Sequence, residues 1–460
     1  MSETPRSARA TWPAVLALAA LATALAGTVT RGGTLGDRDG LYGWYALDAV
    51  LFALAVVLLR RMPPSLVPSL VLAGSVVVAA TGLLAPPRTS DDAYRYLWDG
   101  RVQAAGISPY DHAPDAPELA ELRWQATELF PPGGDCAGWD ERRTAAGECS
   151  HLNRPGVHTV YPPVAEGWFA GLYALGGRYG VRAAQVGGAL LAVATTGVLL
   201  VVLRRLGAGP SWRAALWGWF PGVAVWAVND AHVDTLGVLL LVVSLAAAGR
   251  GRPVIGGALL GLSIATKLVP VLALPGALSG LFARRPRLRD LTLPLAAAAA
   301  LALSYLPYLL ASGPAVLGYL PGYLREEGYD QDHVDRFGLL RLILPDRPAI
   351  VAGVLVILAV AGWVLFRGDP ARPWSGALLV TGTALLVLAP GYPWYGLLVV
   401  ALVVLDGRWE WLAVPAAAQV LYLAGGQAQQ LAYGAALLVA LAGAVGRRRG
   451  AARVSGDGRR

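Results

Sequence analysis

Residues 89–101 read TSDDAYRYLWDGR and open the one long polar interruption in a chain that otherwise consists of apolar runs. Thr89 and Asp92 have the spacing of a capping box, and Tyr94 and Trp98 follow at helical intervals. The stretch is therefore predicted to form a helix. Because the apolar face of this helix is aromatic, we expect it to lie in a membrane interface instead of crossing the bilayer.

The polar interruption extends over residues 86–163 and holds most of the residue types that can do chemistry. The turn residues GISPY at 106–110 end the predicted helix, and YPP at 161–163 leads back into apolar sequence. Asp91 and Asp92 have two open interpretations. They are a general base or a cation site, or they only complement the positive end of the helix dipole.

The composition indicates a membrane protein. The chain has 460 residues, a hydrophobic fraction of 55% and a mean hydropathy of +0.51, which is too apolar for a soluble globular protein. Its net charge of +8 could indicate an acidic partner, but the arginines cluster in short loops and at the termini. That distribution follows the positive-inside rule, so the charge reflects topology and argues against nucleic acid as a partner.

Arginines at the ends of the apolar segments set the predicted orientation. The first run, about 12–29, is as long as a membrane span and lacks a clear cleavage site, so we interpret it as a span and not as a signal peptide. With the N-terminus and Arg60-Arg61 in the cytoplasm, residues 86–163 form the first extracytoplasmic loop. Interpreting 164–177 as an in-plane helix keeps Arg204-Arg205 cytoplasmic.

The predicted fold is an all-α polytopic membrane protein. It forms a single integral domain over 1–460 with about 14 transmembrane helices, and its extracytoplasmic loops carry short interfacial helices. A second extracytoplasmic loop is predicted at 311–344, and residues 446–460 form a basic cytoplasmic tail. We expect a multi-pass plasma-membrane protein with both termini in the cytoplasm.

The only two cysteines, Cys136 and Cys149, fall in the first loop. An even pair on an external face favours a disulfide over two free thiols, and two cysteines this far apart do not suggest zinc.

This topology brings the candidate functional residues to one membrane surface. They are Asp91, Asp92, Asp230, His232, Asp234, Lys267, His333, Arg336 and the turn 392–395. A transporter more often places its ionisable residues at the middle of the membrane, in broken helices and paired halves, which the sequence does not reveal. Polar chemistry on one side favours an enzyme that works at the interface.

Several motifs resemble those of a known family. The stretch DDAYRYLWDG at 91–100, with GISPY and YPP, resembles the first external loop of GT-C glycosyltransferases that use polyprenyl-phosphate sugars. It is most similar to bacterial polyprenyl-phosphate-mannose-dependent mannosyltransferases. Later family motifs are matched by NDAHVD at 229–234, KLVP at 267–270 and YPWY at 392–395. Ser108 and Asp230 depart from the family, which often has Asn and Gly at these positions.

The resemblance implies an inverting glycosyltransferase that moves a sugar, mannose by the same resemblance, from a polyprenyl-phosphate donor to an acceptor hydroxyl. The acceptor is a lipid, a glycan or a protein, and no cofactor is required. The candidate substrate-binding residues are Tyr94, Arg95, Arg101, His232, Asp234, Tyr392, Trp394 and Tyr395.

Such a transfer needs a carboxylate to accept the hydroxyl proton and cations to stabilise the departing phosphate. Asp92 is the preferred base, because Asp91 can pair with Arg95 at i+4 whereas Asp92 has Tyr96 at that position. Lys267 is expected to bind the donor phosphate, together with Arg336 or His333.

Each assignment has a structural alternative. Lys267, the only lysine in the chain, is alternatively a side chain that extends to the interface. His232 and Asp234 alternatively cap the next span, and with Asp230 they are a weak candidate for a divalent-cation site. The aromatic turn 392–395 forms an interfacial belt or a sugar-stacking wall. For the whole protein, the alternatives are a lipid or small-molecule transporter and a non-catalytic scaffold.

Overall fold

The structure is a computed structural model that describes residues 5–133, 135–326 and 336–457. The chain divides into two compact units. Unit 1 comprises Met1–Val271 and Arg287–Glu326, and unit 2 comprises Leu272–Pro286 and Glu327–Arg460. The polar stretch 86–163 therefore lies wholly in unit 1, together with Lys267.

Unit 1 is built from helices and one very short hairpin. Its α-helices are α1 (Pro5–Arg31), α2 (Asp39–Leu59), α3 (Val67–Gly82), α4 (Asp92–Ala104), α5 (Ala120–Trp124), α6 (Pro163–Gly176), α7 (Val181–Leu206), α8 (Ala215–Gly218), α9 (Asp234–Ala248), α10 (Pro253–Ile264), α12 (Thr292–Ser312) and α13 (Leu320–Glu326). Strands β1 (Arg142–Arg143) and β2 (Cys149–Ser150) pair antiparallel.

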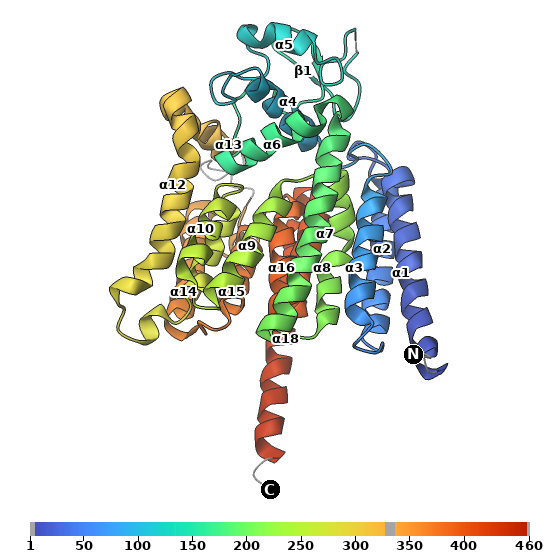
Figure 1. The fold of residues 1–460 in the computed structure, drawn as a ribbon, viewed down its shortest axis with the longest axis vertical. Helices are drawn as coiled ribbons and strands as arrows, with labels where there is room; N and C mark the ends of the chain where they lie inside the picture. Colours follow the sequence, from blue (N-terminus) through green and yellow to red (C-terminus); the bar gives the residue numbers. More distant parts are fainter. Residues whose placement is uncertain (1–4, 134, 327–335, 458–460) are drawn as a thin grey trace. The chain divides into compact units, whose positions relative to one another are not determined.

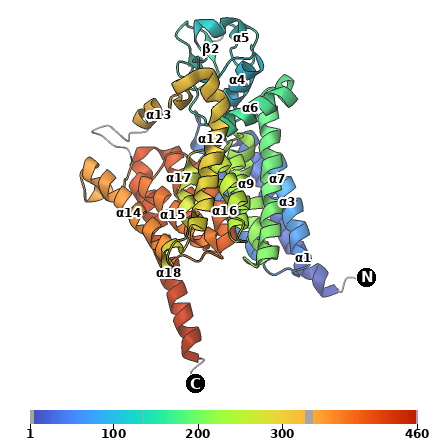
Figure 2. The same ribbon diagram turned by 60° about the vertical axis from the view of Figure 1, so that its left-hand side comes forward.

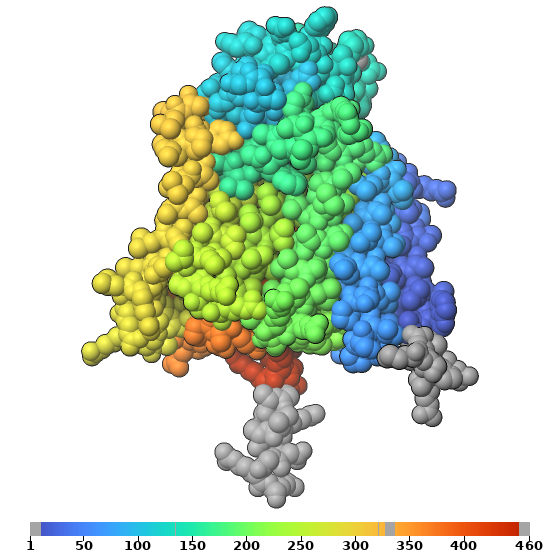
Figure 3. Space-filling model, in the orientation of Figure 1, coloured from blue at the N-terminus to red at the C-terminus, as the bar shows by residue number. Residues whose placement is uncertain are grey.

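The loop 86–163 and the arginine-rich turns lie at opposite ends of the long helices of unit 1 (Figure 1). The loop forms a continuous cap over one end of these helices (Figure 3). Helix α6 lies across the ends of α7 and α9 instead of running beside them, which both ribbon views show (Figures 1 and 2).

The aromatic face of α4 is covered by the loop itself. Trp98 is 1% exposed and its ring contacts the ring of Phe130, with centroids 5.0 Å apart. Leu119, Leu129 and Leu152 complete this small core. The prediction that this face lies in a membrane interface is therefore wrong, because the 78-residue interruption is long enough to fold over the helix and bury its apolar side chains.

A sharp break in one helix brings polar residues to the loop. The π-helical segment η4 (Val223–Asn229) and α9 are bent by 111° relative to each other, and Ala231 between them has a φ of 55°. A Cβ at Gly188 would collide with the carbonyl oxygen of Ala227, so only glycine lets α7 approach η4 this closely. The break, which the sequence does not reveal, positions residues 230–233.

Six helices among the described residues are long and apolar enough to cross a membrane, or seven if the bent pair is one span. Five further apolar helices have only 10–17 residues. The prediction of a helical polytopic membrane protein is thus confirmed at that level, whereas the count of about 14 spans is not confirmed.

Unit 2 contains α11 (Leu274–Ala277), α14 (Asp346–Arg367), α15 (Pro373–Leu388), α16 (Gly396–Asp406), α17 (Ala413–Ala424) and α18 (Gln429–Asp457). The aromatic turn lies between α15 and α16. Its start is anchored by α18, because the Tyr433 hydroxyl donates to the Pro390 carbonyl at 2.9 Å. Within the turn, the rings of Tyr392 and Trp394 stack with centroids 4.9 Å apart.

Candidate active site

The site is built on the first residues of α4, and the helix begins differently from the sequence prediction. It starts at Asp92, and Thr89 makes no capping box. Instead the Thr89 hydroxyl donates to Asp230 Oδ2 at 2.5 Å, and the amides of Arg88, Thr89 and Ser90 donate to Asp230 Oδ1 at 3.1–3.2 Å. Asp230 is fully buried and needs these donors, which explains why they turn away from the helix. The chain before α4 is thereby fixed to the break before α9.

The two neighbouring aspartates share one amide. Asn153 Nδ2 donates to Asp91 Oδ1 at 2.9 Å and to Asp92 Oδ1 at 2.6 Å. On its other oxygen, Asp91 lies 3.5 Å from a guanidinium nitrogen of Arg142. Asn153 could not be predicted as a site residue, because it lies about 60 residues downstream in an irregular segment that carries no recognisable motif.

The segment that supplies Arg142 and Asn153 contains a disulfide. Cys136 and Cys149 are bonded, and Arg142 lies between them in β1, paired with Ser150 of β2. His151 follows β2, stacks on Tyr94 with ring centroids 5.0 Å apart, and forms an ion pair with Asp140 at 3.1 Å. The hairpin therefore covers the start of α4.

The broken helix and α10 approach the aspartates from the other side. Nδ1 of His232 lies 3.4 Å from Asp92 Oδ2, and the His232 side chain is fully buried. Lys267 follows α10 directly, and its ammonium lies 3.2 Å from Asp234 Oδ2 and 5.3 Å from the ring centroid of Tyr161. Unit 1 thus brings together four of the predicted elements: the aspartate pair, the His232 turn, Lys267 and the YPP segment.

Asp91 and Asp92 have opposite electrostatic surroundings. Burial, and then the negative charge of Asp92, raises the pKa of Asp91 to about 6. Burial alone would also raise the pKa of Asp92, but the hydrogen bond and charge of His232, with smaller effects from Lys267 and Asn153, lower this pKa below its ordinary value. Near neutral pH, Asp91 is therefore the better proton acceptor of the two.

The side-chain contacts on which the sequence-based choice of Asp92 rested are not formed. Arg95 pairs with Asp99, at 2.8 and 3.0 Å from its two oxygens, and not with Asp91. Asp92 is held by Asn153 and His232, and not by Tyr96. Arg95 pairs with the carboxylate four residues after it, Asp99, instead of the one four residues before it. Asp92 takes its partners from distant segments, Asn153 and His232, which the sequence spacing cannot reveal.

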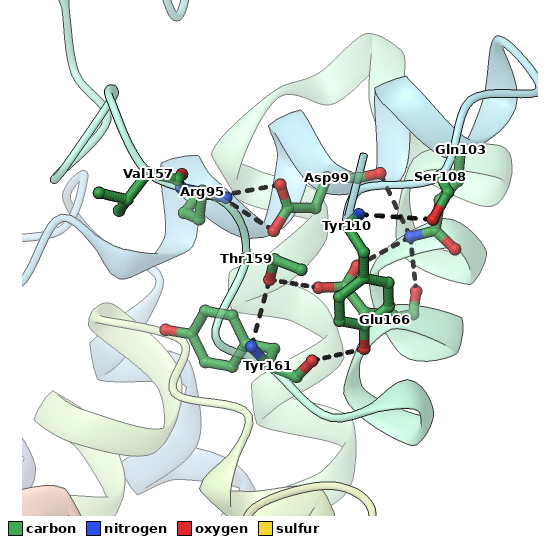
Figure 4. Close-up of polar contacts among 9 residues, drawn as sticks. All are labelled: Arg95, Asp99, Gln103, Ser108, Tyr110, Val157, Thr159, Tyr161 and Glu166. Atoms are coloured by element: carbon green, nitrogen blue, oxygen red, sulfur yellow. Dashed lines mark hydrogen bonds and ion pairs between the residues drawn. The ribbon is translucent and has the colours of Figure 1, made fainter. Parts of the chain in front are cut away.

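The two predicted substrate-binding arginines of α4 differ in their exposure to solvent. Arg95 is 4% exposed and donates to the Val157 carbonyl, so it lies in the interior (Figure 4). Arg101 is partly exposed and contacts the Tyr173 hydroxyl at 3.4 Å. Their binding roles remain predictions.

The remaining candidates belong to unit 2. The guanidinium of Arg336 lies against the aromatic turn, since a Cβ at Gly391 would be 3.2 Å from its Nη1. Tyr392, Trp394 and Tyr395 form one aromatic group. His333 lies outside the described residues.

The three candidate metal ligands each have a separate partner. Asp230 accepts from Thr89, His232 faces Asp92, and Asp234 faces Lys267. Within the described part of the chain, no group of three or more histidine, cysteine, aspartate or glutamate residues could hold a metal ion.

Comparison with known proteins now identifies the family. A search of curated proteins and a search of solved structures each found no match. A model of glycosyltransferase family 87 matches residues 159–390, half of the chain, and this range includes the YPP segment, the His232 turn and Lys267. The geometry around α4 and this match agree with the resemblance to GT-C membrane glycosyltransferases, and the chain belongs to glycosyltransferase family 87.

Proposed function

We propose that this glycosyltransferase moves a sugar, mannose by its resemblance, from a polyprenyl-phosphate donor to an acceptor hydroxyl, with inversion at the anomeric carbon. The observation that carries the proposal is the convergence in unit 1 of two aspartates, the His232 turn and the single lysine of the chain. One part of this group can accept a proton and another can bind a phosphate.

Asp91 is the proposed general base. In the reaction, the acceptor oxygen bonds to the anomeric carbon while the bond from that carbon to the phosphate oxygen breaks, and the hydroxyl proton passes to Asp91. The pKa of about 6 supports this role, because a base titrating just below neutral pH is both deprotonated and able to accept a proton. Asp92, held by His232 and Asn153, would orient its neighbour and keep its pKa raised.

Lys267 is proposed to stabilise the departing phosphate. Its ammonium is held by Asp234 on one side and lies over the face of Tyr161. A preorganised cation of this kind needs little rearrangement when negative charge develops on the leaving group. No resident cofactor is proposed.

The proposed reaction takes place at the extracytoplasmic face of the plasma membrane. The arginine-rich turns of unit 1 lie at the end away from loop 86–163, which by the positive-inside rule supports a cytoplasmic position for those turns. The lipid carrier of the donor would then reach the site from the bilayer.

A transporter is the second candidate, and the bent pair of η4 and α9 favours it, because broken helices with polar residues are typical of transport sites. The two functions separate in one experiment. The purified protein in lipid vesicles receives a lysate as the source of acceptor, together with polyprenyl-phosphate mannose labelled in the sugar, the corresponding glucose donor, or a nucleotide sugar.

The proposal predicts release of polyprenyl phosphate and a product of inverted anomeric configuration from a polyprenyl donor only. Use of the nucleotide sugar would refute the donor class, retained configuration would refute the mechanism, and uptake of intact substrate without chemistry would favour the transporter.

A further inference from the structure

A second group of carboxylates lies two turns further along the same face of α4. Asp99 follows Asp92 by seven residues and is 1% exposed, and Glu166 on α6 is fully buried beside it. Figure 4 shows both side chains within one network of polar contacts. Neither residue has a part in the reaction proposed above.

Glu166 accepts a hydrogen bond on each carboxyl oxygen and, when it is protonated, donates one to Asp99. The Thr159 hydroxyl donates to its Oε1 at 2.6 Å, and Gln103 Nε2 donates to its Oε2 at 3.0 Å (Figure 4). Gln103 in turn accepts from the Tyr308 hydroxyl of α12 at 2.8 Å. This buried hydrogen-bond network joins α4, α6 and α12.

The charges of this site balance only if one carboxyl is protonated. Among the residues that the structure describes, Arg95 is the cation that acts on both carboxyls, and it forms an ion pair with Asp99. The other titratable groups that face the pair, Tyr110 and Tyr308, are neutral acids. Two ionised carboxylates against a single buried guanidinium would leave an uncompensated charge, which is strongly unfavourable. Burial, and then the charge of Asp99, raises the pKa of Glu166 well above its usual range.

The same network reaches the candidate active site. Arg95 donates from Nη1 to the Val157 carbonyl at 3.2 Å, and the Thr159 hydroxyl also accepts from the Tyr161 amide at 3.2 Å. Tyr161 is the residue whose ring lies 5.3 Å below the ammonium of Lys267. A displacement between α4 and α6 would therefore move both the aspartates and the support of Lys267.

We propose that Glu166 is a positioning residue of the glycosyl transfer, held protonated beside Asp99 so that α4 stays fixed to α6 and to residues 157–161. The inference rests on the proposed function. Ionisation of Glu166 would set two like charges against each other and loosen this contact. Transfer then depends on a proton that takes no part in the chemistry.

The first test needs no activity. The infrared spectrum of the purified wild-type protein at neutral pH should contain the C=O band of a buried protonated carboxylic acid, which disappears on titration to alkaline pH. Glu166→Gln should remove the contribution of Glu166, which the wild-type-minus-variant difference spectrum separates from that of other buried carboxyls such as Asp48. The matched control is Glu148→Gln, which removes a carboxylate of loop 86–163 that lies on the surface and pairs with Arg123, and it should leave the band unchanged.

The second test is the pH profile of transfer. Wild-type kcat should fall about tenfold per pH unit once Glu166 ionises, whereas Glu166→Gln, which imitates the protonated form, should lose this alkaline decline. Glu166→Ala should be slow at every pH because it leaves Gln103 and Thr159 without their partner. A wild-type spectrum without the band, or a Gln variant with an unchanged band and pH profile, would overturn the inference. If no variant and no wild-type protein transfers sugar, the proposed function fails, while the infrared result still decides the protonation of Glu166.

Discussion

Asp91 and Asp92 are neighbours in sequence, yet their surroundings give them different proposed roles. Asp92 is fixed by an amide and by His232, and Asp91 carries the raised pKa. Asp91→Asn keeps the size and the contact with Asn153 but cannot accept a proton. It should lower kcat by at least about 10²-fold, because general-base catalysis contributes about that much or more.

Asp92→Asn should cost less and should act mainly by lowering the pKa of Asp91. Both variants must be compared at the same donor saturation, with donor binding as the control for folding. The opposite order of activities would assign the base to Asp92.

The pKa of Asp91 also predicts an acid limit. A base must be deprotonated, so wild-type kcat/KM should rise with pH and level off above about pH 6. Removing the charge of Asp92 lowers the pKa of Asp91, so Asp92→Asn should move this limit to lower pH. An acid limit that does not move in the variant would show that Asp91 is not the group that titrates.

Lys267→Met keeps the aliphatic stem and removes the charge. It should lower kcat/KM for the donor by about 10²-fold, a typical loss for one charge-stabilising group. The control is Asp234→Asn, which removes the ion-pair partner but leaves the ammonium in place. Equal donor kinetics in wild type and Lys267→Met, with intact thermal stability, would reduce Lys267 to a residue that only extends to the interface.

At the scale of elements, the hairpin β1–β2 packs against the start of α4 and holds it in place. Its disulfide joins two cysteines that are 13 positions apart in the sequence, and closing a loop of about this length corresponds to about 3 kcal/mol in the chain-entropy model. Replacing both cysteines by serine should therefore increase amide exchange in the hairpin. It should also slow transfer, because Asn153 and Arg142 would no longer hold the aspartates.

Hydrogen–deuterium exchange resolved by peptide provides the measurement, and α2, which lies outside the loop, is the internal control. Unchanged exchange in the hairpin, with unchanged transfer, would show that the disulfide does not support the site.

The sequence was informative about elements and less so about their contacts. The helix after Asp91 was predictable from its 3.6-residue pattern, and the His232 turn and Lys267 were found from their place at the ends of apolar runs. The break before α9 could not be predicted from the sequence. The π-helical segment is apolar like a membrane span, and its bend accompanies the close contact with Gly188. Asn153 and Glu166 were missed for a related reason, since only the folded loop brings them to α4.

At the scale of the molecule, every proposed role depends on which side of the membrane carries the loop. Glu121 in α5 and Ser65 in the turn between α2 and α3 are both exposed and lie at opposite ends of unit 1. In a background without the native cysteines, a membrane-impermeant thiol reagent added to intact cells should label Glu121→Cys and not Ser65→Cys. Lysed cells should label both. The reverse pattern in intact cells would place the aspartates in the cytoplasm.

Release of polyprenyl phosphate is the measurement that tests the proposed transfer. The purified wild-type protein and the double variant Asp91→Asn, Asp92→Asn are incubated with sugar-labelled polyprenyl-phosphate mannose in lipid vesicles, with a lysate as the source of acceptor. The proposed mechanism predicts acceptor-dependent release of polyprenyl phosphate by the wild type, and a loss of at least about 10²-fold in the double variant, which still binds donor. Full activity in the double variant, or no use of the polyprenyl donor by a folded wild-type protein, would contradict it.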